Sequence, residues 1–271
     1  MTNMQEELKK QEEEIALRMR QVRNKVLVMS GKGGVGKSTV AVNLAAAMAA
    51  SGKKTGLLDI DLHGPNVARM LGIAGMRLES DGESIQPHRA APNLAVCSMA
   101  LLGADPSTAI IWRGPRKTSA IKEMLGGVNW GELDYLFIDS PPGTGDETLT
   151  VAQSLPGLTG AVLVTTPQEV ALDDARRSAS FAGSMKVKIL GVVENMSGFV
   201  CPGCGLETHV FSSGGGEKLA AELGAAFLGR LPLDPKAVMF ADSGRTLFEM
   251  ESGKTRDAAM AIAAKFSEVC P

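Results

Sequence analysis

One segment near the amino terminus constrains the fold of this chain more than any other. The apolar run Val26–Met29 leads into Gly-Lys-Gly-Gly-Val-Gly-Lys-Ser-Thr at residues 31–39, and an apolar helical pattern follows. A strand, a loop of the form GxxxxGK[ST] and a helix in this order are typical of a phosphate-binding P-loop. The sequence therefore predicts a nucleotide site built into an α/β fold.

The residue types of this loop indicate how it would hold a triphosphate. Glycines let backbone N–H groups surround phosphate oxygens, and the N-terminus of the following helix adds partial positive charge. We expect Lys37 to reach the β- and γ-phosphates of ATP, and the Ser38 hydroxyl to coordinate Mg²⁺. The predicted cradle consists of Gly33, Gly34, Val35, Gly36, Lys37, Ser38 and Thr39.

The rest of the chain alternates short apolar runs with longer helical patterns. The apolar runs of strand length are Lys25–Met29, Thr55–Asp59, Leu94–Met99, Tyr135–Asp139, Ala161–Thr165 and Lys188–Val193. The helical patterns are Lys37–Ala50, Arg116–Leu125, Glu147–Ser154, Glu169–Met185, Glu217–Leu223 and Arg256–Val269. Runs that are apolar throughout predict strands covered by helices on both faces, and hence a mostly parallel sheet.

The first residues predict a helix over 4–23, with Leu8, Ile15, Met19 and Val22 on roughly one face. We interpret it as an N-terminal helical extension, residues 1–23, that docks on the main domain or is solvated. Residues 24–271 then form one P-loop ATPase domain. The irregular segment at about 195–216 is an insertion within that domain, and the glycines at 214–216 are expected to free a turn before a helix.

Acidic residues follow two of the predicted strands. Asp59 and Asp61 come at the end of one strand, and Asp139 ends another before Ser-Pro-Pro-Gly-Thr-Gly. Because ligands of parallel sheets bind beyond the carboxyl ends of the strands, these carboxylates are expected at the nucleotide site. An Asp there can hold the attacking water or join the Mg²⁺ shell, and the glycine-rich turn after Asp139 suits a switch that senses the γ-phosphate.

A pair of cysteines lies in the insertion. Cys201 and Cys204 are three positions apart in Cys-Pro-Gly-Cys-Gly, a spacing that lets both sulfurs face one metal or cluster. A four-coordinate site needs two further ligands, which a second copy of the chain would supply. Spacing does not choose between a [4Fe–4S] cluster and Zn²⁺, and a redox pair or inert surface cysteines stay open.

Composition narrows the class of protein. The formal net charge is −2 and aromatic residues make up 4%, which gives no basis for nucleic-acid binding. No apolar run approaches the roughly 18 residues that span a bilayer, and no signal-peptide core follows the first residues. We expect a cytoplasmic protein without membrane association, whose four cysteines are reduced.

With these motifs in place, the sequence resembles the Mrp/ApbC family of iron–sulfur cluster carrier ATPases. That family belongs to a wider group with a deviant Walker A loop, which includes MinD, ParA, ArsA and the nitrogenase iron protein. The resemblance covers about residues 24–265. It is carried by the motifs at 31–38, Asp-Ile-Asp-Leu-His-Gly-Pro at 59–65, Asp-Ser-Pro-Pro-Gly-Thr-Gly-Asp at 139–146, Glu-Asn-Met-Ser at 194–197 and Cys-Pro-Gly-Cys-Gly at 201–205.

The resemblance implies a homodimer that hydrolyses ATP near its interface and passes a labile [4Fe–4S] cluster to apo-proteins. The cluster would be bridged by Cys201 and Cys204 of both chains. By similarity, Lys32 is the signature lysine that reaches the partner's nucleotide, Asp61 positions the water and Asp139 is the Walker B residue. Asn195, together with Pro232 and Asp234 in the stretch 231–234, is implied to contact adenine.

Two other functional classes stay open. One is a positioning ATPase like MinD or ParA, with zinc or no metal at the cysteines. Its membrane-bound members end in a basic amphipathic helix, whereas Arg256–Val269 is rich in alanine and poor in cations. The other is a small-molecule kinase, for which no substrate-lid motif is present.

Overall fold

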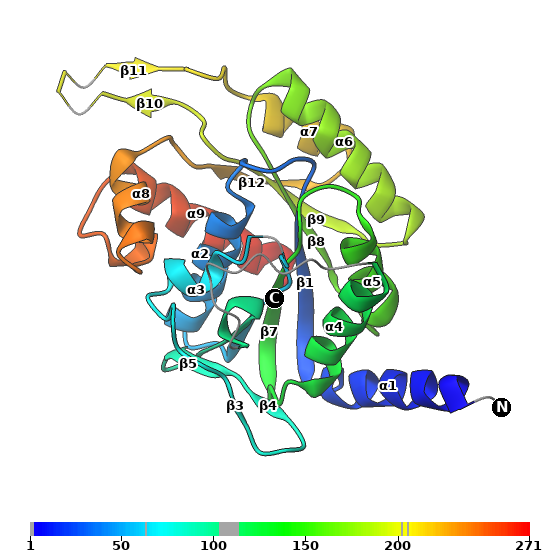
Figure 1. Cartoon of the computed structure of the whole chain (residues 1–271). Helices are drawn as coiled ribbons and strands as arrows, with labels where there is room; N and C mark the ends of the chain where they lie inside the picture. Colours follow the sequence, from blue (N-terminus) through cyan, green and yellow to red (C-terminus); the bar gives the residue numbers. More distant parts are fainter. Residues whose placement is uncertain (1–2, 63, 103–113, 202, 205) are drawn as a thin grey trace.

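A twisted sheet forms the centre of the protein (Figure 1). The computed structural model describes residues 3–62, 64–102, 114–201, 203–204 and 206–271. Within these residues eight strands form one sheet, in the order β12 (Ala226–Arg230), β9 (Ile189–Glu194), β8 (Gly160–Thr165), β1 (Val22–Ser30), β7 (Leu133–Asp139), β2 (Thr55–Asp59), β6 (Leu94–Ser98) and β5 (His88–Ala91). Two short hairpins lie outside it, β10 (Phe199–Val200) with β11 (Glu207–Thr208) and β3 (Glu79–Ser80) with β4 (Ile85–Gln86).

All pairings in the large sheet are parallel except that of β5 with β6 at one edge. β1 lies between β7 and β8, and Asp59 at the end of β2 is in register with Asp139 at the end of β7. The carboxyl ends of β1, β2 and β7 therefore meet at one edge, where the phosphate-binding loop begins.

Helices cover both faces of the sheet. On one face the core includes residues of α2 (Lys37–Ala50), α3 (Val67–Met70) and α9 (Lys254–Val269), and partly buried residues of α8 (Pro235–Asp242) pack against it. On the other face it includes residues of α1 (Asn3–Met19), α4 (Gly114–Gly127), α5 (Asp146–Ser154), α6 (Glu169–Ser184) and α7 (Gly215–Glu222). Two short 3₁₀ helices, Met99–Leu101 and Leu247–Glu249, complete the described elements.

The side chains of β1 show why its sequence is apolar throughout. Val26 and Val28 belong to the core on the α2 face, whereas Leu27 and Met29 belong to the core on the α6 face, and all four are buried. Successive side chains of a strand point to opposite faces, so a strand between two helical layers needs apolar residues at every position. The prediction of a mostly parallel sheet covered on both faces is confirmed.

The N-terminal helix ends before residue 23, where the sequence pattern predicts its end. α1 stops at Met19, and Val22 is the first residue of β1. Val22 pairs with Leu133 of β7, and the Leu133 N–H donates to the Gln21 carbonyl at 3.0 Å, so sheet pairing ends the helix early. Ile15 and Met19 are buried in the core, whereas Leu8 is exposed. The division of the chain at residue 23 stays a prediction.

None of the helices in the described part of the chain combines the length and the apolar character that crossing a bilayer requires.

Candidate functional site: a phosphate-binding loop and a cysteine hairpin

The loop between β1 and α2 turns sharply at two glycines. Gly34 and Gly36 have φ values of 80° and 84°, in the left-handed region that favours glycine. Gly36 is also the N-cap of α2, and it has no side chain with which to bond the first turn. The N–H groups of the first helical turn lack intrahelical partners, so the N-terminus of α2 is suited to bind an anion.

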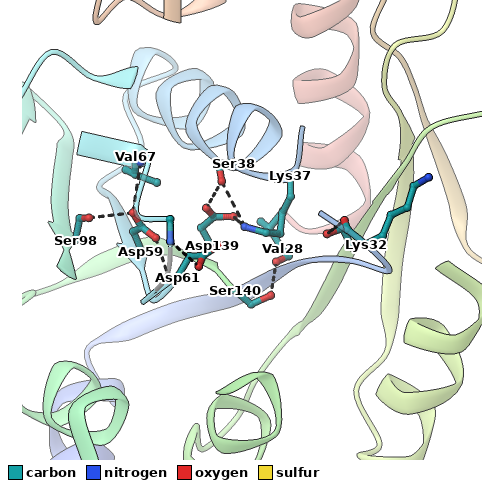
Figure 2. Close-up of polar contacts among 12 residues, drawn as sticks. Val28, Lys32, Lys37, Ser38, Asp59, Asp61, Val67, Ser98, Asp139 and Ser140 are labelled. Atoms are coloured by element: carbon teal, nitrogen blue, oxygen red, sulfur yellow. Dashed lines mark hydrogen bonds and ion pairs between the residues drawn. The ribbon is translucent and has the colours of Figure 1, made fainter. Parts of the chain in front are cut away.

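Asp139 joins the two functional groups at the start of α2 (Figure 2). Its Oδ1 lies 2.5 Å from the Lys37 Nζ, and its Oδ2 accepts a hydrogen bond from the Ser38 hydroxyl at 2.6 Å. Lys37 and Asp139 are both buried. Burial raises the pKa of the Asp139 carboxyl, and the charge and hydrogen bond of Lys37 oppose that rise. The structure thus brings the predicted Walker A and Walker B residues together.

Asp59 organises the acidic loop that carries Asp61. The Asp59 carboxylate is fully buried, and it accepts hydrogen bonds from the Asp61 N–H at 3.1 Å, the Ser98 hydroxyl at 2.9 Å and the Val67 N–H at 3.4 Å. Burial, and then the nearby Asp139 carboxylate, raise the pKa of Asp59 to about 8. One carboxyl group therefore holds both ends of residues 61–67. His63 lies outside the described residues.

The turn after β7 is fastened to the root of the phosphate-binding loop. The Ser140 hydroxyl donates to the Val28 carbonyl at 2.9 Å (Figure 2). The Gly143 N–H donates to the Ser30 carbonyl at 2.8 Å. Beyond these bonds, Thr144 is exposed. A turn that is tied at its root and exposed at its tip can respond to a group bound at the loop.

A cleft of about 330 Å³ opens over the loop. Predicted residues on its wall are Lys32, Gly33, Gly34, Gly36, Lys37, Ser38, Thr39 and Asp61. Pro142, in the turn predicted to sense the γ-phosphate, also lines the cleft, and the residues to which the sequence did not point are Ser30, Asn66, Arg69, Met70, Ala241 and Asp242. The last two belong to α8, far along the chain from the loop, and only the fold brings them there.

The residues implied to contact adenine lie elsewhere. The Asn195 amide is buried behind the loop and donates from Nδ2 to the Val35 carbonyl at 2.8 Å. Asp234 caps α8 by accepting from the Lys236 N–H at 2.8 Å, and it accepts from the Thr255 hydroxyl at 2.5 Å. Pro232 is half-buried between Leu231 and Leu233. None of the three is among the described residues that line the cleft, and adenine contact stays a prediction.

The cysteine pair lies at the tip of the β10–β11 hairpin, which extends from the body of the molecule (Figure 1). The Cys201 N–H donates to the Leu206 carbonyl at 3.0 Å, closing the turn. Cys201 is half-buried and Cys204 is exposed, whereas Pro202 and Gly205 of the predicted knuckle lie outside the described residues. Hydrogen bonds from the Cys204 and Gly203 N–H groups, and from the Cys204 thiol, lower the pKa of Cys201.

The other two cysteines have different surroundings. Cys97 in β6 and Cys270 after α9 are both buried. Burial, and then the Asp59 carboxylate, raise the pKa of the Cys97 thiol to about 12, so it stays protonated. Within the described residues no group of three His, Cys, Asp or Glu side chains could hold a metal ion. In that part of the chain the hairpin thus offers two sulfurs and no third ligand.

A comparison with protein families matches residues 21–267 to the model described as "NUBPL iron-transfer P-loop NTPase". The chain belongs to this family. The match spans the phosphate-binding loop, both acidic strand ends and the hairpin, and it confirms the resemblance inferred from the motifs.

Curated relatives support the same family. A protein of Methanocaldococcus jannaschii named iron-sulfur cluster carrier protein is 49% identical over 88% of this chain and 82% of its own. A protein of Trichoplax adhaerens named cytosolic Fe-S cluster assembly factor NUBP2 homolog is 48% identical, over 85% of this chain and 89% of its own. Family membership therefore rests on alignments over most of both chains.

Solved structures agree on the fold. A nucleotide-binding protein of Archaeoglobus fulgidus in complex with ADP is 36% identical, with a TM-score of 0.76 over 90% of this chain and 98% of that one. The septum site-determining protein MinD of Pyrococcus horikoshii, complexed with Mg-ADP, is 21% identical with a TM-score of 0.68, over 92% and 97% of the two chains. The likeness to MinD shows the fold alone.

Proposed function

We propose that this chain is an ATP-hydrolysing carrier that holds a [4Fe–4S] cluster between two copies of itself and delivers it to apo-proteins. The observation that carries the proposal is the pair Cys201 and Cys204 at an extended hairpin, in a chain of an iron-transfer family. A [4Fe–4S] cluster takes four thiolates. Two chains related by two-fold symmetry would supply them.

The chemistry of the hairpin suits a cluster that is cargo. The lowered pKa of Cys201 increases its thiolate fraction, and thiolates are the form that ligates iron. Cys204 is exposed, so a cluster bound here would be accessible to a recipient protein. The printed names of both relatives, a cluster carrier and a cluster assembly factor, support the same activity. The name of the Trichoplax protein also supports action in the cytosol.

A second copy of the chain would also cover apolar surface beside the thiols. Leu206, beside the cysteine turn, is 66% exposed, and Val210, two residues beyond the end of β11, is 53% exposed. Burial of apolar area is the main force that holds subunits together. A homodimer formed here would bury these side chains and complete the sulfur site together.

The nucleotide half of the proposal rests on the cleft. The Ser38 hydroxyl and the Asp61 carboxylate line the cleft, and the Asp139 carboxylate bonds to Ser38. Oxygen groups of these kinds are ligands that Mg²⁺ prefers, so the residues present fit this ion. When bound, Mg²⁺ neutralises charge on the phosphates. Lys37 would bind the β- and γ-phosphates, and Asp61 would orient water for attack.

Lys32 is proposed to act on the nucleotide of the partner. Its side chain extends away from Lys37 and Asp139 (Figure 2). The Ser30 hydroxyl donates to the Lys32 carbonyl at 3.1 Å, which fixes the backbone from which the side chain leaves. A lysine anchored in this way can place its ammonium group in a neighbouring subunit.

Anaerobic incubation with iron and sulfide tests the proposal. The wild-type chain should become brown and then restore the activity of an apo [4Fe–4S] enzyme, whereas Cys201→Ala/Cys204→Ala should do neither. Cys97→Ala is the matched control, because Cys97 is buried far along the chain from the hairpin, and it should load like the wild type. Equal loading of the double variant and the wild type would refute the assignment.

A further inference from the structure

The carboxylate of Glu194, the last residue of β9, is fully buried and surrounded by donors. Its Oε1 accepts from the Ser197 hydroxyl at 2.5 Å and the Gly214 N–H at 3.0 Å, and lies 3.3 Å from the Arg230 Nε. Its Oε2 accepts from the Gly216 N–H at 2.5 Å. A buried charge is tolerated when it is paired and hydrogen-bonded, as this one is.

The partners of Glu194 are the two ends of the cysteine insertion. The chain enters the hairpin through Ser197, two residues before β10, and leaves it through Gly214, where α7 begins. Both residues bond the same carboxylate oxygen. A Cβ atom at residue 216 would lie 2.8 Å from the Glu194 Cβ, so glycine there permits the close approach. One side chain therefore clamps the root of the hairpin.

Backbone bonds extend the clamp to the hairpin itself. The Ser197 N–H donates to the Leu231 carbonyl at 2.9 Å, and the Leu233 N–H donates to the Gly198 carbonyl at 2.8 Å. Phe199 of β10 then forms a parallel bridge with Leu233. The parallel pairing of β9 with β12 thus continues beyond the strand ends as far as Phe199, two residues before Cys201.

The residue after Glu194 contacts the phosphate-binding loop. The Asn195 Nδ2 donates to the Val35 carbonyl, and a Cβ atom at residue 36 would lie 2.0 Å from the same nitrogen. The Asn195 N–H donates to the Thr165 carbonyl at 2.8 Å, which anchors the backbone between the two side chains. Asn195 therefore bonds to the phosphate-binding loop, and its neighbour Glu194 bonds to both ends of the cysteine insertion.

We propose that Glu194 is a positioning residue for the cluster: it sets where Cys201 and Cys204 stand relative to the phosphate-binding loop. The inference rests on the proposed cluster-carrying function. Four thiolates from two chains meet at one cluster only if each hairpin has a fixed position. Glu194→Gln replaces one acceptor oxygen by an amide that faces N–H donors, and it removes the charge opposite Arg230.

The test compares the Glu194→Gln chain with the wild type, each as the full-length protein. First, amide hydrogen exchange is measured without the cluster, and residues 197–216 should exchange about tenfold faster while residues 31–39 stay unchanged. Second, the reconstituted cluster should be lost to a chelator about tenfold faster, with altered visible circular dichroism. ATP affinity should stay within about twofold, because Glu194 does not touch the loop.

Three further variants sharpen the test. Ser197→Ala removes one bond to the same carboxylate, so it should show a smaller change in hydrogen exchange and in cluster loss. If Glu194→Gln does not fold, this variant tests the positioning role in its place. Ser197→Thr keeps the hydroxyl and should behave like the wild type. Glu217→Gln makes the same chemical change in the exposed partner of Arg230. It should have little effect, because exposed ion pairs contribute little.

The outcomes separate this inference from the function on which it rests. Unchanged hydrogen exchange in Glu194→Gln, or faster exchange with an unchanged rate of cluster loss, would overturn the positioning role. A loss of ATP affinity in Glu194→Gln as large as its increase in the rate of cluster loss would also overturn the positioning role, because the effect would then be general unfolding. Failure of the proposed function would appear differently, as a wild-type chain that takes up no cluster.

Discussion

At the scale of single residues, buried carboxylates organise the nucleotide site. Asp139 holds Lys37 and Ser38, and Asp59 holds the loop that carries Asp61. Both carboxyl groups are removed from water, so their positions are set by the groups that they bond. Asp61 itself lines the cleft, and its Oδ1 accepts from the Gly64 N–H at 3.2 Å. It is therefore placed toward the solvent side, where a bound nucleotide would lie.

Lys37 is proposed to bind the phosphates and Asp61 to orient the attacking water, so substitutions at the two residues should cause different defects. Asp61→Asn should bind ATP about as well as the wild type but hydrolyse it about 10²-fold more slowly, because an amide is a poor base for water. Lys37→Ala should lose most of its ATP affinity, because no cation then faces the phosphates. Equilibrium binding of a fluorescent ATP analogue and single-turnover phosphate release measure the two quantities. Wild-type turnover by Asp61→Asn would remove Asp61 from the catalytic role.

The sequence predicted the site residues that belong to a continuous motif. Lys37 and Asp139 are recognisable because glycines, a lysine or an apolar strand stand directly beside them. The clamping roles of Asp59 and Glu194 were missed, because their partners Ser98, Gly214 and Gly216 are distant in sequence. A hydrogen bond between distant residues leaves no local pattern.

At the scale of elements, the β10–β11 hairpin is the part of the molecule that a partner chain would use. It carries the thiols at its tip and exposed apolar side chains at its arm. Its strands have two residues each, and a two-stranded hairpin of this size is marginally stable on its own. Its position therefore depends on the root and, in the proposed dimer, on the partner.

Charges placed on the hairpin should weaken the dimer. Leu206→Asp/Val210→Asp puts two carboxylates where apolar surface is proposed to be buried, so the cluster-loaded dimer should dissociate at a concentration at least about tenfold higher. Leu17→Asp is the matched control, because Leu17 is equally exposed but lies on α1. Sedimentation velocity measures both. A double variant as dimeric as the wild type would exclude this surface.

Some elements were predictable and others were not. Helix α2 and strand β2 begin and end as predicted, because a glycine loop or a charged turn bounds each apolar pattern. Strand β12 and helix α8 were missed. The resemblance assigns the segment before α8 to adenine contact, although Asp234 at the N-cap and Pro235 at the first position are helix-start signals.

At the scale of the whole molecule, the parallel sheet explains why distant motifs converge. β1, β2, β7 and β9 all end at one edge, so the phosphate-binding loop, both acidic ends and the Glu194–Asn195 pair lie on the same side. This convergence was predictable from the order of strands and helices. The assembly of two copies is also expected from the sequence, through the lone cysteine pair and the family resemblance, and it stays a proposal because one chain contains only half of a symmetric site.

The central claim is that two copies of the chain share one cluster. Native mass spectrometry of the anaerobically reconstituted protein tests it most directly, because the method counts chains and clusters in one particle. The account predicts a species of two chains with a single [4Fe–4S] cluster, and its absence for Cys201→Ala/Cys204→Ala. A single chain that retains a whole cluster or a zinc ion, or a dimer with one metal centre in each chain, would contradict it.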